Sequence, residues 1–187
     1  AFKPIIYAAA IDNGFTPASV IIDSPITYEN SETNLVWKPK NYDDKFNGRT
    51  LLRDALAHSR NVVTIKILKD IGVDYAIKYA RNMGITSELS RNLSLALGSS
   101  GVSLFELVRA YSVFANQGLL IQPVFIEKIV DRDGKILEEA KPSFNQVIEK
   151  NTAYIMTSLL RSVVAYGTGQ RMLGLNRPVV GKTGTTN

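Results

Sequence analysis

The final residues of the chain, 181–187, contain the side chains best suited to binding a ligand. A cation stands beside two hydroxyl groups, with a residue that lacks a Cβ between the hydroxyls: Lys182, Thr183, Gly184 and Thr185. The apolar run 178–180 predicts a strand leading into them. Side chains alternate faces along a strand, so Lys182 and Gly184 would share one face, and Thr183 and Thr185 the other. Such an edge can pair with an extended peptide and bind its terminal carboxylate, and Gly184 would leave room for the peptide backbone.

Two other interpretations of this run were weighed. A short Lys-Thr-Gly sequence also occurs in ordinary turns, and that alternative stays open. A phosphate-binding loop of the form G-x-x-x-x-G-K-[ST] needs a glycine at position 176 and a helix after Thr183. The chain has Asn176 there, and Gly184 follows Thr183, so the pattern disfavours a phosphate loop.

A second reactive group stands at the beginning of the chain. The apolar stretch 2–11 predicts a helix that ends at Asp12-Asn13-Gly14, and Pro4 fits its first turn. Lys3 would lie at the helix N-terminus in apolar surroundings, where burial and the helix dipole both favour a neutral amine. A neutral lysine can serve as a general base. The alternative is a lysine that extends its ammonium group into solvent.

Ser59 and Asn61 form a third polar group. We expect Thr50 to cap a helix with apolar residues at helical spacing, and a second helix to run from Val62 to Asp70. Ser59 and Asn61 would then occupy the short turn between two helices, a rigid mount for polar side chains. Asn61 could equally be only the N-cap of the second helix, and His58 is expected to be a packing or surface residue.

The rest of the chain predicts mostly helices. Residues 15–48 show no sustained period and predict an irregular connection, and residues 95–101 predict a flexible turn. Ser103 and Glu106 have the form of a capping box at the start of a helix. The remaining expected elements are a helix at 73–82, a hairpin that turns at 131–134, and a helix from Asn151 or Thr152 to about Ala165.

Composition excludes several classes of function. With 187 residues, 45% of them hydrophobic, the chain can form the core of one domain. It has no cysteine and one histidine, which rules out disulfides, thiolate metal sites and histidine clusters. The net charge of +5 is dispersed without a basic run, which argues against nucleic acid as a partner. No apolar run approaches the ~18 residues of a membrane span.

Taken together in chain order, Lys3, Ser59-Arg60-Asn61 and Lys182-Thr183-Gly184 resemble the penicillin-binding transpeptidases. The three motifs of that family are S-x-x-K, S-x-N and K-[TS]-G. The resemblance continues between the motifs and is closest to the bifunctional, class A members. The further segments that carry it are 55–61, 95–100, 111–118, 131–134 and 167–169.

The resemblance implies a nucleophilic serine three residues before Lys3, so that the chain is a fragment starting just after it. It also implies a mixed α/β fold of the beta-lactamase/transpeptidase type, mainly helical here, with most strands of the central antiparallel sheet missing at both ends. Residues 1–187 would then be one partial transpeptidase domain. Gly101 and Met172 depart from the family pattern, which has Glu and Ala at those positions.

The resemblance also implies a role for each candidate site residue. Lys3 would accept the serine proton, Ser59 would relay it to the leaving amine, and Asn61 would bind the substrate amide. Lys182 would supply positive potential, while Thr183 and Thr185, flanking Gly184, would bind the terminal carboxylate. The Thr185 amide would also donate to the oxyanion.

By the same resemblance, the substrate is a peptidoglycan stem peptide that ends in D-Ala-D-Ala, and beta-lactams acylate the same serine. No metal or organic cofactor is implied. The parent protein would carry a glycosyltransferase domain and a membrane anchor at the periplasmic, extracytoplasmic face of the bacterial inner membrane. The 187-residue chain alone, without the serine, would not be acylated by labelled penicillin.

Two rival functions were weighed against this one. A beta-lactamase or carboxypeptidase would use water as acceptor, and a class A beta-lactamase needs a glutamate for deacylation. Glu88 and Glu106 are the candidates, but the capping box explains Glu106, and Glu88 lacks the expected surroundings. The other rival is a binding module with a decayed site, for which the codon before Ala1 would encode a residue other than serine.

Overall fold

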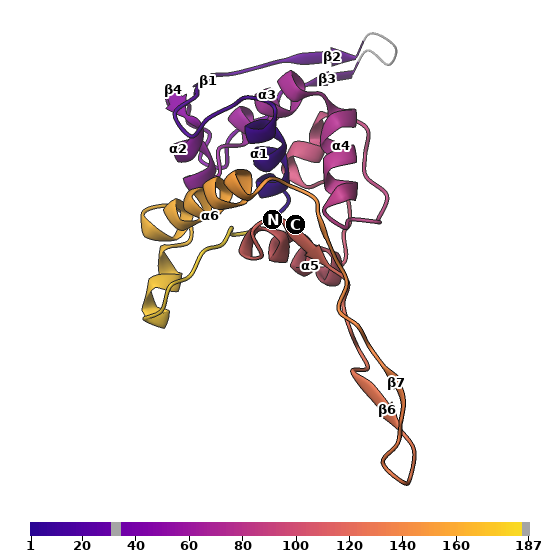
Figure 1. The fold of residues 1–187 in the computed structure, drawn as a ribbon. Helices are drawn as coiled ribbons and strands as arrows, with labels where there is room; N and C mark the ends of the chain where they lie inside the picture. Colours follow the sequence, from indigo (N-terminus) through magenta and orange to yellow (C-terminus); the bar gives the residue numbers. More distant parts are fainter. Residues whose placement is uncertain (31–34, 185–187) are drawn as a thin grey trace.

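The computed structural model describes residues 1–30 and 35–184, and within them the fold is mixed α/β and mainly helical (Figure 1). The fold class expected from the resemblance is therefore confirmed. The α-helices are α1 (Lys3–Asp12), α2 (Leu52–Ala57), α3 (Asn61–Ile71), α4 (Val73–Asn82), α5 (Leu104–Ala115) and α6 (Lys150–Ala165). Two short 3₁₀ helices cover Leu93–Leu97 and Gln170–Leu175.

Helix α1 lies at the centre of the helical body and packs against α3, α4 and α6 (Figure 1). Its residues are apolar on every side, as expected for a helix enclosed by others, and Ile5, Ile6 and Tyr7 have no exposed surface. The same enclosure extends to its first turn, where the Lys3 residue is only 7% exposed. The sequence of α1 therefore carries a lysine into the core.

The strands form four antiparallel pairs: β1 (Val20–Asp23) with β4 (Gly48–Leu51), β2 (Tyr28–Asn30) with β3 (Leu35–Trp37), β5 (Leu119–Ile121) with β8 (Phe144–Gln146), and β6 (Lys128–Val130) with β7 (Ile136–Glu139). The predicted irregular connection over residues 15–48 was wrong, because β1, β2 and β3 lie inside it. These strands are only three or four residues long, which is too short to show a periodic pattern. In addition, β1 pairs with β4, at the other end of the segment, so its pairing leaves no local signal.

Three other local predictions need correction. Thr50 lies in β4 and caps nothing; α2 begins at Leu52 with Leu51 in the N-cap position. The expected turn at 95–101 contains the end of a 3₁₀ helix. The predicted strand at 178–180 is absent, since residues 176–184 form no strand. A strand needs a hydrogen-bonded neighbour, and no segment among the described residues pairs with this one.

Other local predictions are confirmed. Ser103 and Glu106 form a complete capping box at the start of α5. The hairpin that turns at 131–134 exists, with β6 and β7 as its strands. The helix predicted from Val62 is present as α3, but both interpretations of Asn61 were wrong. Asn61 lies neither in the turn nor at the N-cap; it is the first residue of α3, and Arg60, in the N-cap position, makes no side-chain capping hydrogen bond.

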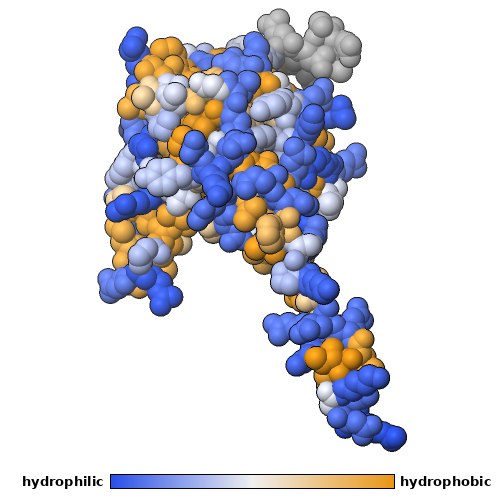
Figure 2. Space-filling view, in the orientation of Figure 1, coloured by the Kyte–Doolittle hydropathy of each residue, from blue (hydrophilic) through white to orange (hydrophobic). Residues whose placement is uncertain are grey.

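The β6–β7 hairpin extends far from the helical body (Figure 1). Figure 2 shows apolar side chains gathered along this arm, and Val130, Ile136 and Leu137 are 47%, 50% and 61% exposed. The tip of the arm is the polar turn 131–135.

In the described part of the chain, no helix has the length and apolar character needed to span a bilayer.

Gly167, directly after α6, touches the end of α2. A Cβ built on it would lie 2.2 Å from the carbonyl oxygen of Ala57 and 2.9 Å from that of Val163. We therefore expect Gly167→Ala to displace backbone, at a cost of about 1–3 kcal/mol, and to lower the melting temperature of the full-length protein by several degrees. Gly174→Ala, where a Cβ meets nothing within 4 Å, is the control. Equal melting temperatures for the two variants would contradict this prediction.

Candidate active site

The amine of Lys3 is the centre of the candidate site. Its Nζ donates to the Asn61 side-chain oxygen at 2.7 Å, to the Ser59 carbonyl oxygen at 2.7 Å and to Ser59 Oγ at 3.2 Å. Lys3 comes from the first turn of α1, Ser59 comes from the turn between α2 and α3, and Asn61 is the first residue of α3. Two of the three polar groups singled out in the sequence are therefore in direct contact, although 56 residues separate Lys3 from Ser59.

The surroundings of Lys3 favour its neutral form. Burial, followed by the positive charges of Lys182 and Arg60, lowers the pKa of Lys3 from 10.5 to about 7. An ammonium group loses hydration in the interior and is repelled by nearby cations, and both effects disfavour the proton. A substantial fraction of Lys3 is therefore unprotonated near neutral pH, as a general base requires.

Ser59 is held in an unusual backbone conformation. Its φ is +56°, a left-handed value that is unfavourable for residues other than glycine. The Ser59 N–H donates to the Leu56 carbonyl at 3.1 Å, and the Arg60 N–H donates to the Ala55 carbonyl at 2.8 Å. This is the Schellman pattern at the end of a helix, in which glycine usually occupies the left-handed position. The pattern ends α2 abruptly and turns the Ser59 carbonyl and hydroxyl toward Lys3.

The third group, at the end of the chain, lies beside the beginning of α1. A Cβ built on Gly184 would be 3.5 Å from the Ala1 nitrogen, and in Figure 1 the last described residues return to the start of the chain. After burial, the charge of Lys182 is the largest cause of the lowered pKa of Lys3. The pKa of Lys182 is itself lowered by burial to about 8. All three motifs thus lie around the start of α1.

The hydroxyl of Thr183 has two neighbours. Lys182 Nζ donates to Thr183 Oγ1 at 3.2 Å, and the Thr168 hydroxyl lies 2.7 Å from the same oxygen. The backbone of Thr168 is held as well, because its N–H donates to the Ala57 carbonyl at 3.0 Å. The segment after α6 therefore connects the end of α2 to Thr183. Thr185, predicted to bind the carboxylate and the oxyanion, lies outside the described residues.

Glu106, a candidate for activating water, is occupied by local hydrogen bonds. It accepts from the Thr86 and Ser87 N–H groups at 2.6 and 2.7 Å and from the Ser87 hydroxyl at 2.5 Å, in addition to the capping box with Ser103. The side-chain hydrogen bonds from Ser87 and Thr86 lower the pKa of Glu106. Its role is to fasten the start of α5 to the segment after α4.

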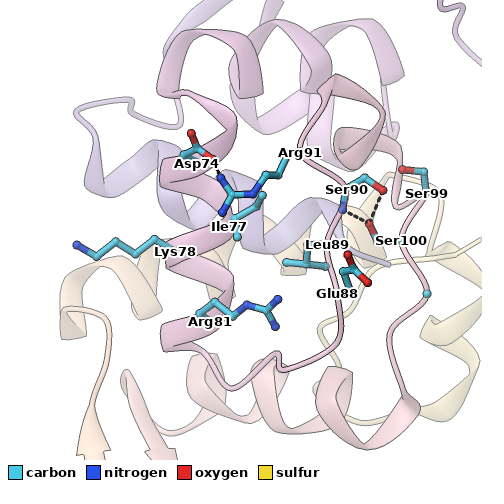
Figure 3. A pocket seen from close by; sticks show the side chains of 11 residues that line it. Asp74, Ile77, Lys78, Arg81, Glu88, Leu89, Ser90, Arg91, Ser99 and Ser100 are labelled. Atoms are coloured by element: carbon cyan, nitrogen blue, oxygen red, sulfur yellow. Dashed lines mark hydrogen bonds and ion pairs between the residues drawn. The ribbon is translucent and has the colours of Figure 1, made fainter.

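Glu88, the other candidate, lines an open groove of about 1060 Å³ between α4 and residues 99–101 (Figure 3). Figure 3 shows Arg91 paired with Asp74 across this groove, at 2.9 Å. None of Lys3, Ser59, Asn61 and Lys182 lines it. The position of Glu88 therefore gives no support to a water-activating role at the Lys3 site.

Several residues that shape the site were not singled out from the sequence. Asn41 Oδ1 accepts from the Asn61 N–H at 2.8 Å, and Asp23 pairs with Arg60 at 2.8 Å. Tyr111 donates its hydroxyl to the Ala1 carbonyl at 2.7 Å. Each partner lies between 20 and 110 residues away, so no local pattern could have identified these contacts.

Comparison with known proteins gives one consistent picture. The family model of the penicillin binding protein transpeptidase domain matches residues 1–187. Penicillin-binding protein 1A of Pseudomonas aeruginosa is 38% identical and that of Neisseria meningitidis 42% identical; both matches cover the whole chain, but only 29% and 24% of those proteins. The structure of penicillin-binding protein 1A from Haemophilus influenzae superposes with a TM-score of 0.94 at 31% identity, over the whole chain and 34% of that protein.

Proposed function

We propose that the protein is a peptidoglycan DD-transpeptidase, because this chain belongs to the penicillin binding protein transpeptidase domain family. The enzyme would crosslink stem peptides that end in D-Ala-D-Ala through an acyl-serine intermediate. The observation that carries the proposal is the set of three hydrogen bonds from the Lys3 amine to Ser59 and Asn61. This set lies at the start of α1, beside the Lys-Thr-Gly segment.

The nucleophile in this proposal is a serine that directly precedes Ala1 in the full-length protein. A residue at that position would extend the chain from the Ala1 nitrogen, which is next to Gly184. Phe2, before α1, already has helical dihedral angles (φ −73°, ψ −25°). If the helical conformation continues to the serine, its hydroxyl would lie on the same side as Lys3, because residues three apart are neighbours on a helix surface. Neutral Lys3 would then accept the hydroxyl proton without help from a histidine.

The proposed reaction has two half-reactions. The serine oxygen attacks the carbonyl carbon of the penultimate D-Ala, the bond to the last D-Ala breaks, and the serine proton passes through Lys3 and Ser59 to the departing amine. The amine of a neighbouring stem peptide then attacks the ester. A new amide forms, and the serine regains a proton through the same groups. Asn61 would hold the amide of the donor peptide during both steps.

Lys182 and Thr183 would bind the substrate carboxylate, together with Thr185. A carboxylate beside Lys182 makes a charge-assisted hydrogen bond, which is about twice as strong as a neutral one. Beta-lactams carry a carboxylate and a reactive amide, so the same groups would direct them onto the serine. The proposal places the domain at the periplasmic face of the inner membrane, in a protein that also has an anchor and a glycosyltransferase domain.

Incubation of the full-length protein with fluorescent penicillin tests this function. We expect one covalent label on the serine before Ala1, an adduct that persists for many minutes, and crosslinked product from stem-peptide substrates. Serine→Ala at that position is the control and should abolish labelling. Absence of labelling in the wild-type protein would contradict the proposal, and prompt hydrolysis of the drug would indicate a beta-lactamase instead.

Thr168 offers a further prediction about the carboxylate site. Thr168→Val removes the hydroxyl that lies 2.7 Å from Thr183 Oγ1. A hydrogen bond of this kind contributes about 1 kcal/mol, so we expect the concentration of beta-lactam for half-maximal acylation to rise about fivefold. Thr168→Ser keeps the hydroxyl and should resemble the wild type. Equal behaviour of the valine and serine variants would show that this contact has no role in binding.

A further inference from the structure

The segment between β3 and β4 supplies a cap for helix α3. The buried side chain of Asn41 accepts two backbone hydrogen bonds through Oδ1, from the Asn61 N–H at 2.8 Å and the Val62 N–H at 3.2 Å. The first amides of a helix have no partner within the helix, and the N-cap residue Arg60 supplies none. Asn41 therefore takes the part of an N-cap from 20 residues away in the sequence.

Asn41 is itself held in one orientation. Its Nδ2 donates to Asp23 Oδ1 at 2.8 Å and to the Lys45 carbonyl at 2.9 Å. The Asp23 side chain has no exposed surface, and its other oxygen accepts from Arg60 Nε at 2.8 Å. Because the donors and the acceptor of the Asn41 amide all have partners, a flipped amide would lose hydrogen bonds on both sides.

The neighbouring residue orients the side chain of Asn61 as well. Asn61 Nδ2 donates to the Lys40 carbonyl at 3.1 Å, which leaves Oδ1 to accept from Lys3 Nζ at 2.7 Å. Residues 40 and 41 thus contact Asn61 at both its backbone and its side chain. Both contacts join the segment between β3 and β4 to Asn61, and Asn41 in turn contacts Asp23 of β1.

We propose that Asn41, backed by Asp23, is a positioning residue that sets where Ser59 and Asn61 meet the amine of Lys3. Ser59 is kept at φ +56°, and strained conformations persist only where the surroundings determine them from several sides. Asn41 is one of these constraints, since it fixes the backbone two residues after Ser59. The proposal rests on the transpeptidase function, because it assigns a role within that reaction.

The test measures acylation of the full-length protein by fluorescent penicillin at a series of drug concentrations. Asn41→Ala removes the acceptor for both N–H groups and lets the turn relax. Because a misplacement of about 1 Å can cost about 100-fold in rate, we expect the maximal acylation rate to fall about 10- to 100-fold. The half-saturating concentration should change less than the maximal rate constant, since Lys182 and Thr183 still bind the carboxylate. A merely destabilised protein would instead be labelled to a lower final extent, with the rate constant of its folded fraction unchanged.

Tyr79→Phe is the matched control for loss of a buried hydrogen bond. It removes a hydroxyl that donates to Asp12 at 2.6 Å, at the opposite end of α1 from Lys3. We expect this variant to melt at a lower temperature and to acylate at the wild-type rate. If Tyr79→Phe slowed acylation as much as Asn41→Ala, general destabilisation would explain both results, and the inference would be overturned.

If Asn41→Ala does not fold, a second pair of variants that exchanges the side chains of Asn41 and Asp23 provides the test. Asn41→Asp places a second carboxylate against buried Asp23, whereas adding Asp23→Asn restores a donor opposite an acceptor. We expect the double variant to acylate at least about fivefold faster than Asn41→Asp alone, which corresponds to one recovered hydrogen bond. No recovery would overturn the inference.

Failure of the inference can be told apart from failure of the proposed function. If the wild-type protein is not labelled, the transpeptidase function is wrong. If the wild-type protein is labelled and Asn41→Ala is labelled at the same maximal rate, the function stands and only the positioning role is refuted.

Discussion

Glutamine in place of Lys3 is expected to lower the rate of acylation by penicillin about 10²- to 10⁴-fold, the usual contribution of a general base. Glutamine has nearly the length of lysine and can still donate a hydrogen bond to Ser59 or Asn61, but it cannot accept a proton from the nucleophile. Removing the Lys3 charge from a buried position also relieves repulsion with Lys182 and Arg60. The variant should therefore remain folded, and the loss should lie in the chemical step.

Lys66→Gln is the matched control for this substitution. Lys66 also uses its ammonium group in hydrogen bonds, to the Ile22 carbonyl at 2.6 Å and to Ser24 Oγ at 3.0 Å, but among the described residues it makes no hydrogen bond to Lys3, Ser59, Asn61 or Lys182. We expect this variant to acylate at the wild-type rate. The measurement is the second-order rate constant from stopped-flow or gel fluorescence. A Lys3→Gln protein that acylates within tenfold of the wild type would remove Lys3 from the role of base.

The rate of acylation at low drug concentration is expected to follow a bell-shaped curve in pH. The pKa of Lys3 is about 7, because of burial and the neighbouring cations. The active form of this base is neutral, and about half of Lys3 is neutral at pH 7, so the rate should fall about 50-fold between pH 7 and pH 5. Above pH 7 the remaining protonated half is lost, and Lys3 can raise the rate only about twofold more.

We attribute the fall of the rate at high pH to deprotonation of Lys182. Burial lowers the pKa of Lys182 to about 8, so its positive charge, which would attract the drug's carboxylate, disappears as the pH rises above that value. Lys182→Arg should keep the charge, because arginine stays protonated in this range. We expect that variant to lose the falling side and to keep the rising side. A wild-type rate that does not change between pH 5 and pH 7 would contradict the assignment of Lys3 as the base.

The same pKa shift has a consequence for stability. An unfolded chain holds the Lys3 proton up to about pH 10.4, whereas the folded protein releases it near pH 7. Between these values the unfolded state binds more protons, so this group makes the folded state less stable as the pH falls from about 10 toward 7. Below pH 7 both states are protonated, and Lys3 adds no further pH dependence. The pH dependence of acylation below 7 is therefore separable from this effect.

Features that depend on residues close together in the sequence could be predicted from it. The apolar stretch 2–11 predicted a helix, and the Ser103–Glu106 spacing predicted a capping box; both are present. The order and types of the three polar motifs were enough to indicate the family, because each motif is a short run of fixed spacing. The short strands β1 to β3 escaped prediction, since three or four residues give no reliable period.

What the sequence by itself determined is therefore the set of reactive groups: an amine at a helix start, a serine and an asparagine close together in the chain, and a lysine next to a threonine. Only the tertiary structure decided how they work together. It places Lys3 where burial and two cations lower its pKa, it holds Ser59 in a left-handed conformation, and it brings Asn41, Asp23 and Thr168 against the motifs. The physical reason is that desolvation and hydrogen bonds between distant segments depend on which surfaces pack together, and no spacing along the chain encodes them.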